Sequence, residues 1–280
     1  MYPAKFDYHR AGSVEEAVAL LQEHGDDAKL LAGGHSLIPM MKLRLANPAV
    51  LIDLGRIDEL RGITQDNGSV RIGAMSTYAE IASSDIGLDA LTDACAIIGD
   101  RQVRNRGTIG GNLAHNDPAG DLPAVALALG AEIEAIGPDG ARTIAADDFI
   151  EDLLETSLEE NEVMTAITFP ASGASAYAKF ENPASGYAIC GVAAKVEASN
   201  GVIHSCRVAV NGASDYAQRL TEVEDALTGQ AATAENIASA SANAGENLEF
   251  LADIHADEAY RAHLTKVLTR RALEAAVARA

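Results

Sequence analysis

The chain has 280 residues, of which 48% are hydrophobic and 22% charged, so it can bury a core and is neither disordered nor fibrous. Its 41 Asp and Glu residues outnumber 21 Lys and Arg residues, and the net charge of −20 argues against nucleic acid or an anionic membrane as a partner, because both require a basic face. No apolar run approaches the roughly 18 residues of a membrane span and no apolar signal region opens the chain, so a soluble, cytoplasmic protein without membrane insertion is expected.

The first third of the chain predicts short alternating elements. A helix is expected from Ser13 to Gly25, because Ser13 and Glu16 have capping-box spacing and a glycine suits the C-terminal end of a helix. A strand, a helix and a strand are then predicted over residues 28–32, 39–45 and 50–54. The turn residues Asp66-Asn-Gly68 predict a β-hairpin over residues 62–75.

The middle third predicts helices around a long irregular stretch. Thr77 and Glu80 repeat the capping-box spacing before a helix, and residues 88–98 predict another. Residues 99–121 show little periodicity and are rich in Gly, Asn, Asp and Arg, so we expect a long functional loop there. A buried helix and three strands are predicted over residues 121–129, 131–136, 140 onward and 163–169.

The C-terminal third predicts an α+β layer. The small, polar segment Ala171–Ala176 is expected to separate it from what precedes. Three antiparallel strands and three helices are predicted over residues 177–180, 190–197, 202–210, 220–227, 234–244 and 258–278. The three cysteines stand outside any C-x-x-C pair and the seven histidines are dispersed, so neither a metal site nor an iron–sulfur cluster is expected in this chain.

Two glycine-rich motifs are the candidate functional segments. They are Ala32-Gly33-Gly34-His35-Ser36 and Thr108-Ile109-Gly110-Gly111-Asn112. Paired glycines can take positive φ and let backbone N–H groups converge on an anion, so the two motifs together could grip the two phosphates of a dinucleotide, with the glycines leaving room for them. Each motif alone is more often a tight turn. Neither motif matches G-x-G-x-x-G, which disfavours a Rossmann dinucleotide site, and neither carries the lysine of a P-loop.

The longer segments Leu30–Leu45 and Gly107–Pro123, which contain these motifs, resemble the two FAD-binding signatures of the flavoprotein, or medium, subunit of molybdenum hydroxylases. That family includes carbon monoxide dehydrogenase and the FAD region of xanthine dehydrogenase. The resemblance implies a two-subdomain FAD-binding fold of the PCMH-like type, residues 1–57 and 58–172, followed by a small α+β domain over residues 173–280 with a three-stranded antiparallel sheet.

The resemblance also implies the cofactor contacts. FAD would lie extended between the subdomains, with the pyrophosphate and ribityl chain wrapped by the two motifs and their flanking residues. Asp121, Met164 and Lys179 fall where the family places acidic, apolar and lysine residues near the cofactor, and Tyr187 resembles the aromatic residue that covers the isoalloxazine. The implied contacts are Leu31, Ala32, Gly33, Gly34, His35, Ser36, Leu37, Thr108, Ile109, Gly110, Gly111, Asn112, Asp121, Met164, Lys179 and Tyr187.

Each of these positions also has a simpler explanation. Asp121 could cap the helix that follows it, Lys179 could be a surface residue, and Met164 and Tyr187 could belong to the core. Gly186 stands where the family usually has an arginine or aspartate, so this chain lacks the charged side chain that the family places at the outer face of the flavin. His35 follows paired glycines as in covalent flavin oxidases of the berberine-bridge type, but those carry a substrate domain too large for this chain.

The function implied is that of an oxidoreductase subunit that transfers electrons. A large partner with a molybdenum cofactor would oxidise the substrate, a small partner with [2Fe–2S] clusters would relay electrons, and FAD in this chain would pass them to an external acceptor. No catalytic acid or base is required of this chain. The family also implies a dimer of heterotrimers. A stand-alone flavin oxidase or reductase and a non-redox nucleotide-binding assembly protein remain as alternatives.

Overall fold

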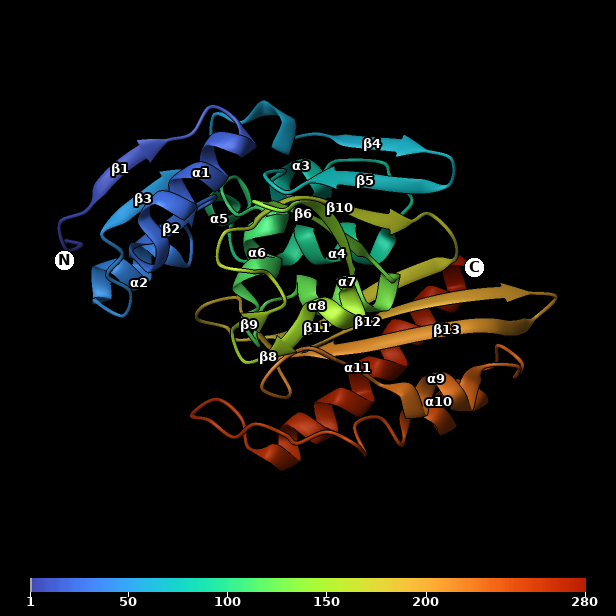
Figure 1. Cartoon of the computed structure of the whole chain (residues 1–280). Coiled ribbons are helices and arrows are strands. Elements are labelled where there is room, and N and C mark those ends of the chain that lie inside the picture. Colours follow the sequence, from blue (N-terminus) through green and yellow to red (C-terminus); the bar gives the residue numbers. More distant parts are fainter. Residues whose placement is uncertain (1) are drawn as a thin grey trace.

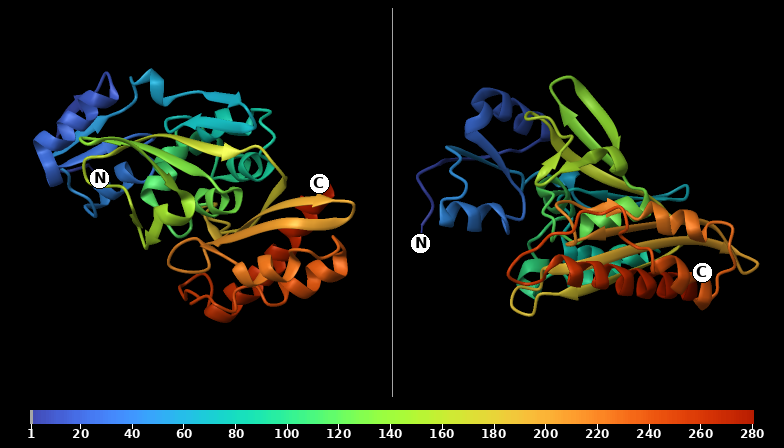
Figure 2. Two further views of the ribbon diagram at one scale, coloured as in Figure 1. Left: turned by 45° about the vertical axis from the view of Figure 1, so that its right-hand side comes forward. Right: turned by 90° about the horizontal axis from the view of Figure 1, so that it is seen from below.

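The computed structural model describes residues 2–280, which form three consecutive parts that pack on one another (Figures 1 and 2). An N-terminal parallel sheet lies at one end, a mixed central part follows, and the C-terminal part closes the other end with helices on its outer face. The α+β class is confirmed. No helix in residues 2–280 is both long and apolar enough to span a membrane.

The N-terminal part is a three-stranded parallel sheet in the order β1-β3-β2. The expected capping of its first helix is confirmed, because the Ser13 side chain accepts a hydrogen bond from the Glu16 N–H and Gly25 adopts φ 51°. Strand β1 was not predicted, because its four residues are polar or exposed and show no apolar alternation. The elements are β1 (Asp7–Arg10), α1 (Val14–His24), η1 (Gly25–Asp27), β2 (Ala28–Leu31), α2 (Leu37–Leu43), β3 (Val50–Asp53) and η2 (Asp58–Leu60).

The central part is a five-stranded antiparallel sheet, β4-β5-β10-β6-β7, with helices packed against it. The predicted hairpin turn is confirmed by positive φ at Asn67 and Gly68, and the predicted capping box of Thr77 and Glu80 is complete. The strands are β4 (Ile63–Asp66), β5 (Ser69–Gly73), β6 (Glu132–Gly137), β7 (Gly140–Ala145), β8 (Ile150–Asp152), β9 (Glu155–Thr156) and β10 (Val163–Pro170). The helices are α3 (Tyr78–Ala82), α4 (Asp89–Ile97), α5 (Arg101–Arg104), α6 (Ile109–His115), α7 (Leu122–Leu129) and α8 (Ala146–Phe149).

The prediction of a long loop over residues 99–121 is wrong, because helices α5 and α6 occupy much of it. The second glycine motif is the first turn of α6, and Thr108 caps that helix by accepting a hydrogen bond from the Gly111 N–H at 3.2 Å. Two consecutive glycines disfavour a helix by propensity, which is why the sequence pattern gave no helical signal. Tertiary contacts outweigh that preference here.

The C-terminal part is a four-stranded antiparallel sheet, β11-β12-β13-β14, rather than the three-stranded sheet expected, because the two-residue strand β14 adds to its edge. Helices α4 and α7 pack on one face and α9 and α11 on the other. All eight residues of α7 are buried, so this helix joins the central and C-terminal cores. The elements are β11 (Ala174–Glu181), β12 (Ala188–Ser199), β13 (Val202–Asn211), β14 (Gln218–Arg219), α9 (Thr221–Leu227), α10 (Ala234–Ser241) and α11 (Glu258–Arg279).

A small substitution at Gly110 should destabilise the junction of α6 and β5. A Cβ atom there would lie 2.6 Å from the Ala74 Cβ and 2.8 Å from the Ala74 carbonyl oxygen, so the backbone must shift. We expect Gly110→Ala to lower the free energy of unfolding by about 1–3 kcal/mol in chemical denaturation. Gly12→Ala is the control, because its Cβ would meet nothing closer than 3.4 Å; equal stability of the two variants would contradict this packing.

Candidate functional site

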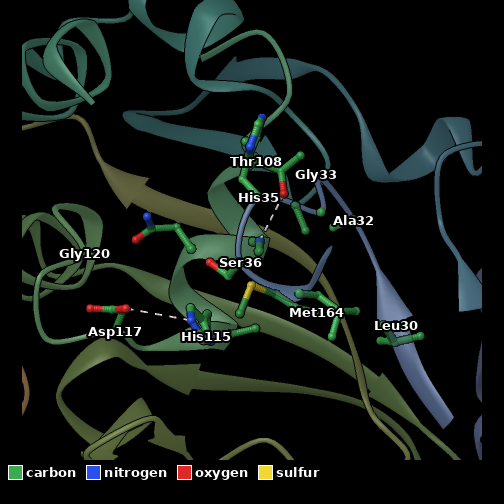
Figure 3. A pocket seen from close by; sticks show the side chains of 18 of the residues that line it. Leu30, Ala32, Gly33, His35, Ser36, Thr108, His115, Asp117, Gly120 and Met164 are labelled. Atoms are coloured by element: carbon green, nitrogen blue, oxygen red, sulfur yellow. Dashed lines mark hydrogen bonds and ion pairs between the residues drawn. The ribbon is translucent and has the colours of Figure 1, made fainter. Parts of the chain in front are cut away.

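A cleft of about 760 Å³ runs between the N-terminal and central parts and reaches the loop that carries Tyr187. Both glycine motifs line it, and Figure 3 shows Gly33, His35, Ser36 and Thr108 gathered at its centre. The volume falls in the range of small-molecule and cofactor sites. The sequence-predicted residues that line the cleft are Ala32, Gly33, Gly34, His35, Ser36, Leu37, Thr108, Gly110, Gly111, Asn112, Asp121, Met164 and Tyr187.

Three predicted contacts do not line the cleft. Leu31 ends strand β2 just before the first motif, Ile109 is fully buried in the central core, and the Lys179 side chain is 2% exposed behind Asp121. Each of them therefore supports a cleft residue from behind.

The first glycine motif supplies a run of unpaired backbone donors. Among residues 2–280, the N–H groups of residues 33–37 donate to no protein acceptor, and they follow one another around a bend in which Gly34 has φ 76°. A Cβ is rarely tolerated at that φ, so glycine is required there. Successive free amides in such a bend form a concave anion-binding nest.

The glycines of the second motif do not supply free amides, contrary to expectation. The Ile109 N–H donates to the Ser76 carbonyl at 3.0 Å, the Gly110 N–H to the Ala74 carbonyl at 2.9 Å, and the Gly111 N–H to Thr108 Oγ1. These amides of α6 are therefore occupied by protein acceptors and are not available to a ligand. Within residues 2–280 the second motif leaves one amide, the Thr108 N–H, without a protein acceptor, whereas the first motif leaves a continuous run of them.

The glycines also serve a different purpose from the one predicted. A Cβ on Gly33 would lie 2.3 Å from the Arg106 carbonyl oxygen and 3.0 Å from the Gly107 Cα, so Gly33 allows the backbones of the two segments to touch. On Gly110 the Cβ would meet Ala74 rather than the cleft. Close approach of protein backbone, and not space for phosphate, explains glycine at these two positions.

Asn112 presents an unsatisfied acceptor to the cleft. Its Nδ2 donates to the Tyr78 hydroxyl at 3.0 Å, whereas its Oδ1 is buried and has no hydrogen-bond partner in the described part of the chain. A buried polar atom without a partner costs roughly 1–3 kcal/mol, so such an atom in a cleft points to a ligand that donates to it.

Asp121 anchors a buried polar network at one end of the cleft. Its carboxylate lies 2.9 Å from Lys179 Nζ and accepts a hydrogen bond from the Tyr177 hydroxyl at 2.7 Å. Burial raises the pKa of Asp121, and Lys179 opposes that rise. Asp121 occupies the N-cap position of α7, as expected, but its side chain makes no capping hydrogen bond and bonds to Lys179 and Tyr177 instead.

The backbone makes room for this network. Gly191, on β12, pairs with Lys179 across the sheet, and a Cβ on it would lie 2.0 Å from the Tyr177 hydroxyl oxygen. The Asn211 amide lies 3.0 Å from the same hydroxyl. Glycine at 191 therefore lets the tyrosine reach the aspartate through the sheet.

Met164 and Tyr187 also line the cleft. A β-bulge between Met164 and Ala166 redirects the strand where Met164 enters the wall. Tyr187 is 48% exposed, and burial together with the carboxylates of Asp117 and Asp121 raises the pKa of its hydroxyl. Gly186 adopts φ 72°, so a glycine suits this loop where the family pattern has a charged residue.

Several cleft residues were missed from the sequence. His115 and Asp117, 3.9 Å apart and both labelled in Figure 3, lie within the segment 107–123 that carried the resemblance, so that segment was the available signal. Tyr78 lies within the Thr77–Glu80 capping box, which signals a helix start and not a binding site, and Glu159 and Glu160 come from a segment with no motif. Only the tertiary structure brings them to the cleft.

Removal of the Lys179 charge should destabilise the protein in a pH-dependent way. Lys179→Met leaves the Asp121 carboxylate buried without a cation, and we expect a loss of roughly 3–5 kcal/mol of unfolding free energy at about pH 8. A carboxyl whose folded-state pKa is raised stabilises the fold below its unfolded pKa and loses that contribution as pH rises through the folded pKa. The loss should therefore be smaller at about pH 5, where the unpaired Asp121 binds a proton.

Urea denaturation at both pH values measures this effect. Asp121→Asn combined with Lys179→Met should recover part of the stability at high pH, because no buried charge then remains. Lys266→Met, at an exposed position on α11, is the control. The same loss at both pH values would contradict a buried charge pair.

Comparison with known proteins assigns the family. Residues 4–172 match the FAD binding domain in molybdopterin dehydrogenase, and residues 175–276 match the CO dehydrogenase flavoprotein C-terminal domain. The chain is 43% identical to the carbon monoxide dehydrogenase medium chain of Hydrogenophaga pseudoflava, over 100% of this chain and 99% of that one. It is 37% identical to the nicotine 6-hydroxylase medium subunit of Paenarthrobacter nicotinovorans, over 97% of each chain.

Solved structures agree with this assignment. A chain of carbon monoxide dehydrogenase from Hydrogenophaga pseudoflava superimposes with a TM-score of 0.96 at 44% identity and covers 100% of this chain and 99% of its own. The similarity therefore extends over both matched domains and the cleft between the glycine motifs. The chain belongs to the FAD-binding medium subunits of molybdenum hydroxylases of the carbon monoxide dehydrogenase and xanthine dehydrogenase type.

Proposed function

We propose that this chain binds FAD in the cleft and transfers electrons from a [2Fe–2S] subunit to an external acceptor, within a complex whose large subunit carries the molybdenum cofactor. The run of free N–H groups at residues 33–37 carries the proposal, because it offers an anion-binding nest in a cleft of cofactor size. The unpartnered Oδ1 of Asn112 supports it, since ribityl hydroxyls are hydrogen-bond donors.

The two ends of the cleft differ in the way that an extended FAD requires. The middle, at residues 33–37, would take the pyrophosphate. The end with Asp121 and Tyr187 would take the isoalloxazine, because an aromatic ring can cover a flat ring system. The opposite end, between Leu30 and Leu158, would then take the adenosine.

The residues proposed to touch FAD are those of the predicted set that line the cleft. Leu31, Ile109 and Lys179 would act from behind, through the strand end, the core under α6, and Asp121. Lys179 and Tyr177 hold the Asp121 carboxylate in place, so its position at the flavin end does not depend on the cofactor.

FAD, when bound, accepts single electrons and passes on electron pairs. This chain then needs no acid, base or nucleophile of its own. Its residues would position the flavin ring, exclude water from it with Tyr187 and Met164, and set its reduction potential through the charge of the Asp121–Lys179 pair.

The division of the chain into domains and the assembly of the complex are part of the same proposal. The division into residues 1–57, 58–172 and 173–280 places the cleft between the first two parts, and the family matches, which meet between residues 172 and 175, support the second boundary. A dimer of heterotrimers in the cytoplasm is proposed for the complex by analogy with the family.

The experiment is purification of the chain together with the large and small subunits of its complex, followed by assays for FAD, molybdenum and iron. We expect one FAD per chain, released intact by acid precipitation, and loss of electron transfer to an acceptor dye after FAD is stripped while the clusters still become reduced. Turnover by the isolated chain would favour a stand-alone flavin enzyme. Absence of FAD would favour a non-redox assembly protein, and flavin that stays with the precipitate would indicate a covalent bond to His35.

Asn112 should contribute to FAD affinity through its free acceptor. Asn112→Ala removes a buried oxygen that would otherwise accept from the cofactor, and we expect FAD to bind about 3- to 10-fold more weakly. Fluorescence titration of the stripped protein measures the dissociation constant. Asn243→Ala, at an exposed position far along the chain, is the control. An unchanged affinity would remove Asn112 from the contact set.

Tyr187 should affect the reactivity of the flavin more than its retention. Tyr187→Ala uncovers one side of the proposed ring site, and we expect stoichiometric FAD with a changed rate of flavin reoxidation, measured by stopped-flow absorbance. Tyr187→Phe keeps the ring and should behave like the wild type. Identical reoxidation in the alanine variant would place Tyr187 in ordinary packing.

A further inference from the structure

A second pocket adjoins the cleft at the glycine motifs. It has a volume of about 290 Å³ and shares part of its wall with the cleft, at Ala32, Gly33, Met75 and Thr108. Its other walls come from the ends of β1 and β3, from the residues after η2, and from the end of α5. It therefore opens across the junction of the N-terminal and central parts.

Four arginines converge on this pocket in a chain whose net charge is −20. They are Arg10, Arg56, Arg61 and Arg106. The one carboxylate in its wall, Asp53, already accepts hydrogen bonds from Arg10, Tyr8 and the Gly55 N–H. Four arginines against one aspartate leave a formal charge of +3, and like charges held together are unfavourable unless an anion completes the site.

The free guanidinium groups identify the binding surface. Within residues 2–280, Arg56 and Arg106 form no ion pair or hydrogen bond through their side chains, and Arg61 has only a 3.5 Å contact with the Gly55 carbonyl. Arg56 and Arg106 are exposed, and so is Asn105, which also lines the pocket. Guanidinium groups suit carboxylates, with which they form paired, parallel hydrogen bonds.

We propose that this pocket, Arg10–Arg56–Arg61–Arg106, is the docking point for an acidic segment of another subunit of the complex. The proposal rests on the assignment of the chain as a subunit. The pocket is too small for a dinucleotide but accommodates one or two carboxylate side chains. An isolated exposed ion pair contributes little, whereas several carboxylates on one polypeptide would bind together and shield the arginines from water. Charge complementarity of this kind selects the partner and speeds association.

A cysteine at the pocket reports whether it is covered. The three native cysteines are buried, so Asn105→Cys places one reactive thiol at the wall of the pocket. With FAD present throughout, we expect a maleimide reagent to modify it at least about tenfold more slowly in the purified complex than in the isolated chain. Arg271→Cys, on the exposed side of α11, should react equally in both. Equal rates at Asn105→Cys would overturn the proposal.

Charge reversal tests the chemistry of the contact. Arg56→Glu with Arg106→Glu should weaken association with the other subunits by at least about tenfold at low salt, whereas the matched pair Lys266→Glu with Arg271→Glu should change it little. Equal weakening by both pairs would show that net charge alone matters and would overturn the docking site. So would protection of Asn105→Cys in the isolated chain by inorganic phosphate or by FAD, because the pocket would then hold a small anion or the cofactor.

The outcomes separate this proposal from the proposed function. A wild-type chain that contains no FAD and does not associate with other subunits would contradict the proposed function itself. A wild-type chain that assembles and carries FAD, with the Arg56 and Arg106 variant assembling equally well, would contradict only the docking site.

Discussion

The contact between the backbones of two segments far apart in the sequence is the constraint on which the site depends. Gly33 lies against the carbonyl of Arg106, Gly107 lies against the ring of Tyr78, and Gly110 lies against Ala74. A side chain at any of these positions would meet neighbouring atoms at 2.6 Å or less. The contact at Gly33 holds the first glycine motif against the segment that leads into α6, and the contacts at Gly107 and Gly110 hold that segment against residues 74–78.

The two glycine motifs differ in where their backbone N–H groups donate. Helix α6 directs its first amides to Ala74, Ser76 and Thr108, so it is a rigid wall. The bend at residues 33–37 leaves its amides without protein acceptors and is the part that can bind an anion. A nest of main-chain donors needs no basic side chain, so a net charge of −20 does not prevent this chain from offering an anion site.

Charges on the two sides of this junction have different roles. On the cleft side, one buried pair, Asp121 and Lys179, sits in a network with Tyr177 and is shielded from solvent. In the second pocket, exposed arginines gather with one carboxylate, Asp53, which is paired with Arg10. A buried pair is satisfied within the chain and can tune a cofactor, whereas exposed guanidinium groups without partners are available to another polypeptide.

The sequence by itself determined the elements with strong local signals and the class of ligand. The capped helix at Ser13, the Asn67-Gly68 hairpin and the capping box at Thr77 depend on neighbouring residues, and the glycine motifs are contiguous, so all could be recognised. Only the tertiary structure decided which amides are free, because the acceptors that occupy the Ile109 and Gly110 amides, the carbonyls of Ser76 and Ala74, lie in the distant segment that follows β5. It also decided that Gly33 and Gly110 serve packing, that Lys179 reaches Asp121 from 58 residues away, and that arginines from four segments form one pocket. These properties arise from pairs of residues distant in the chain, and no local pattern encodes such pairs.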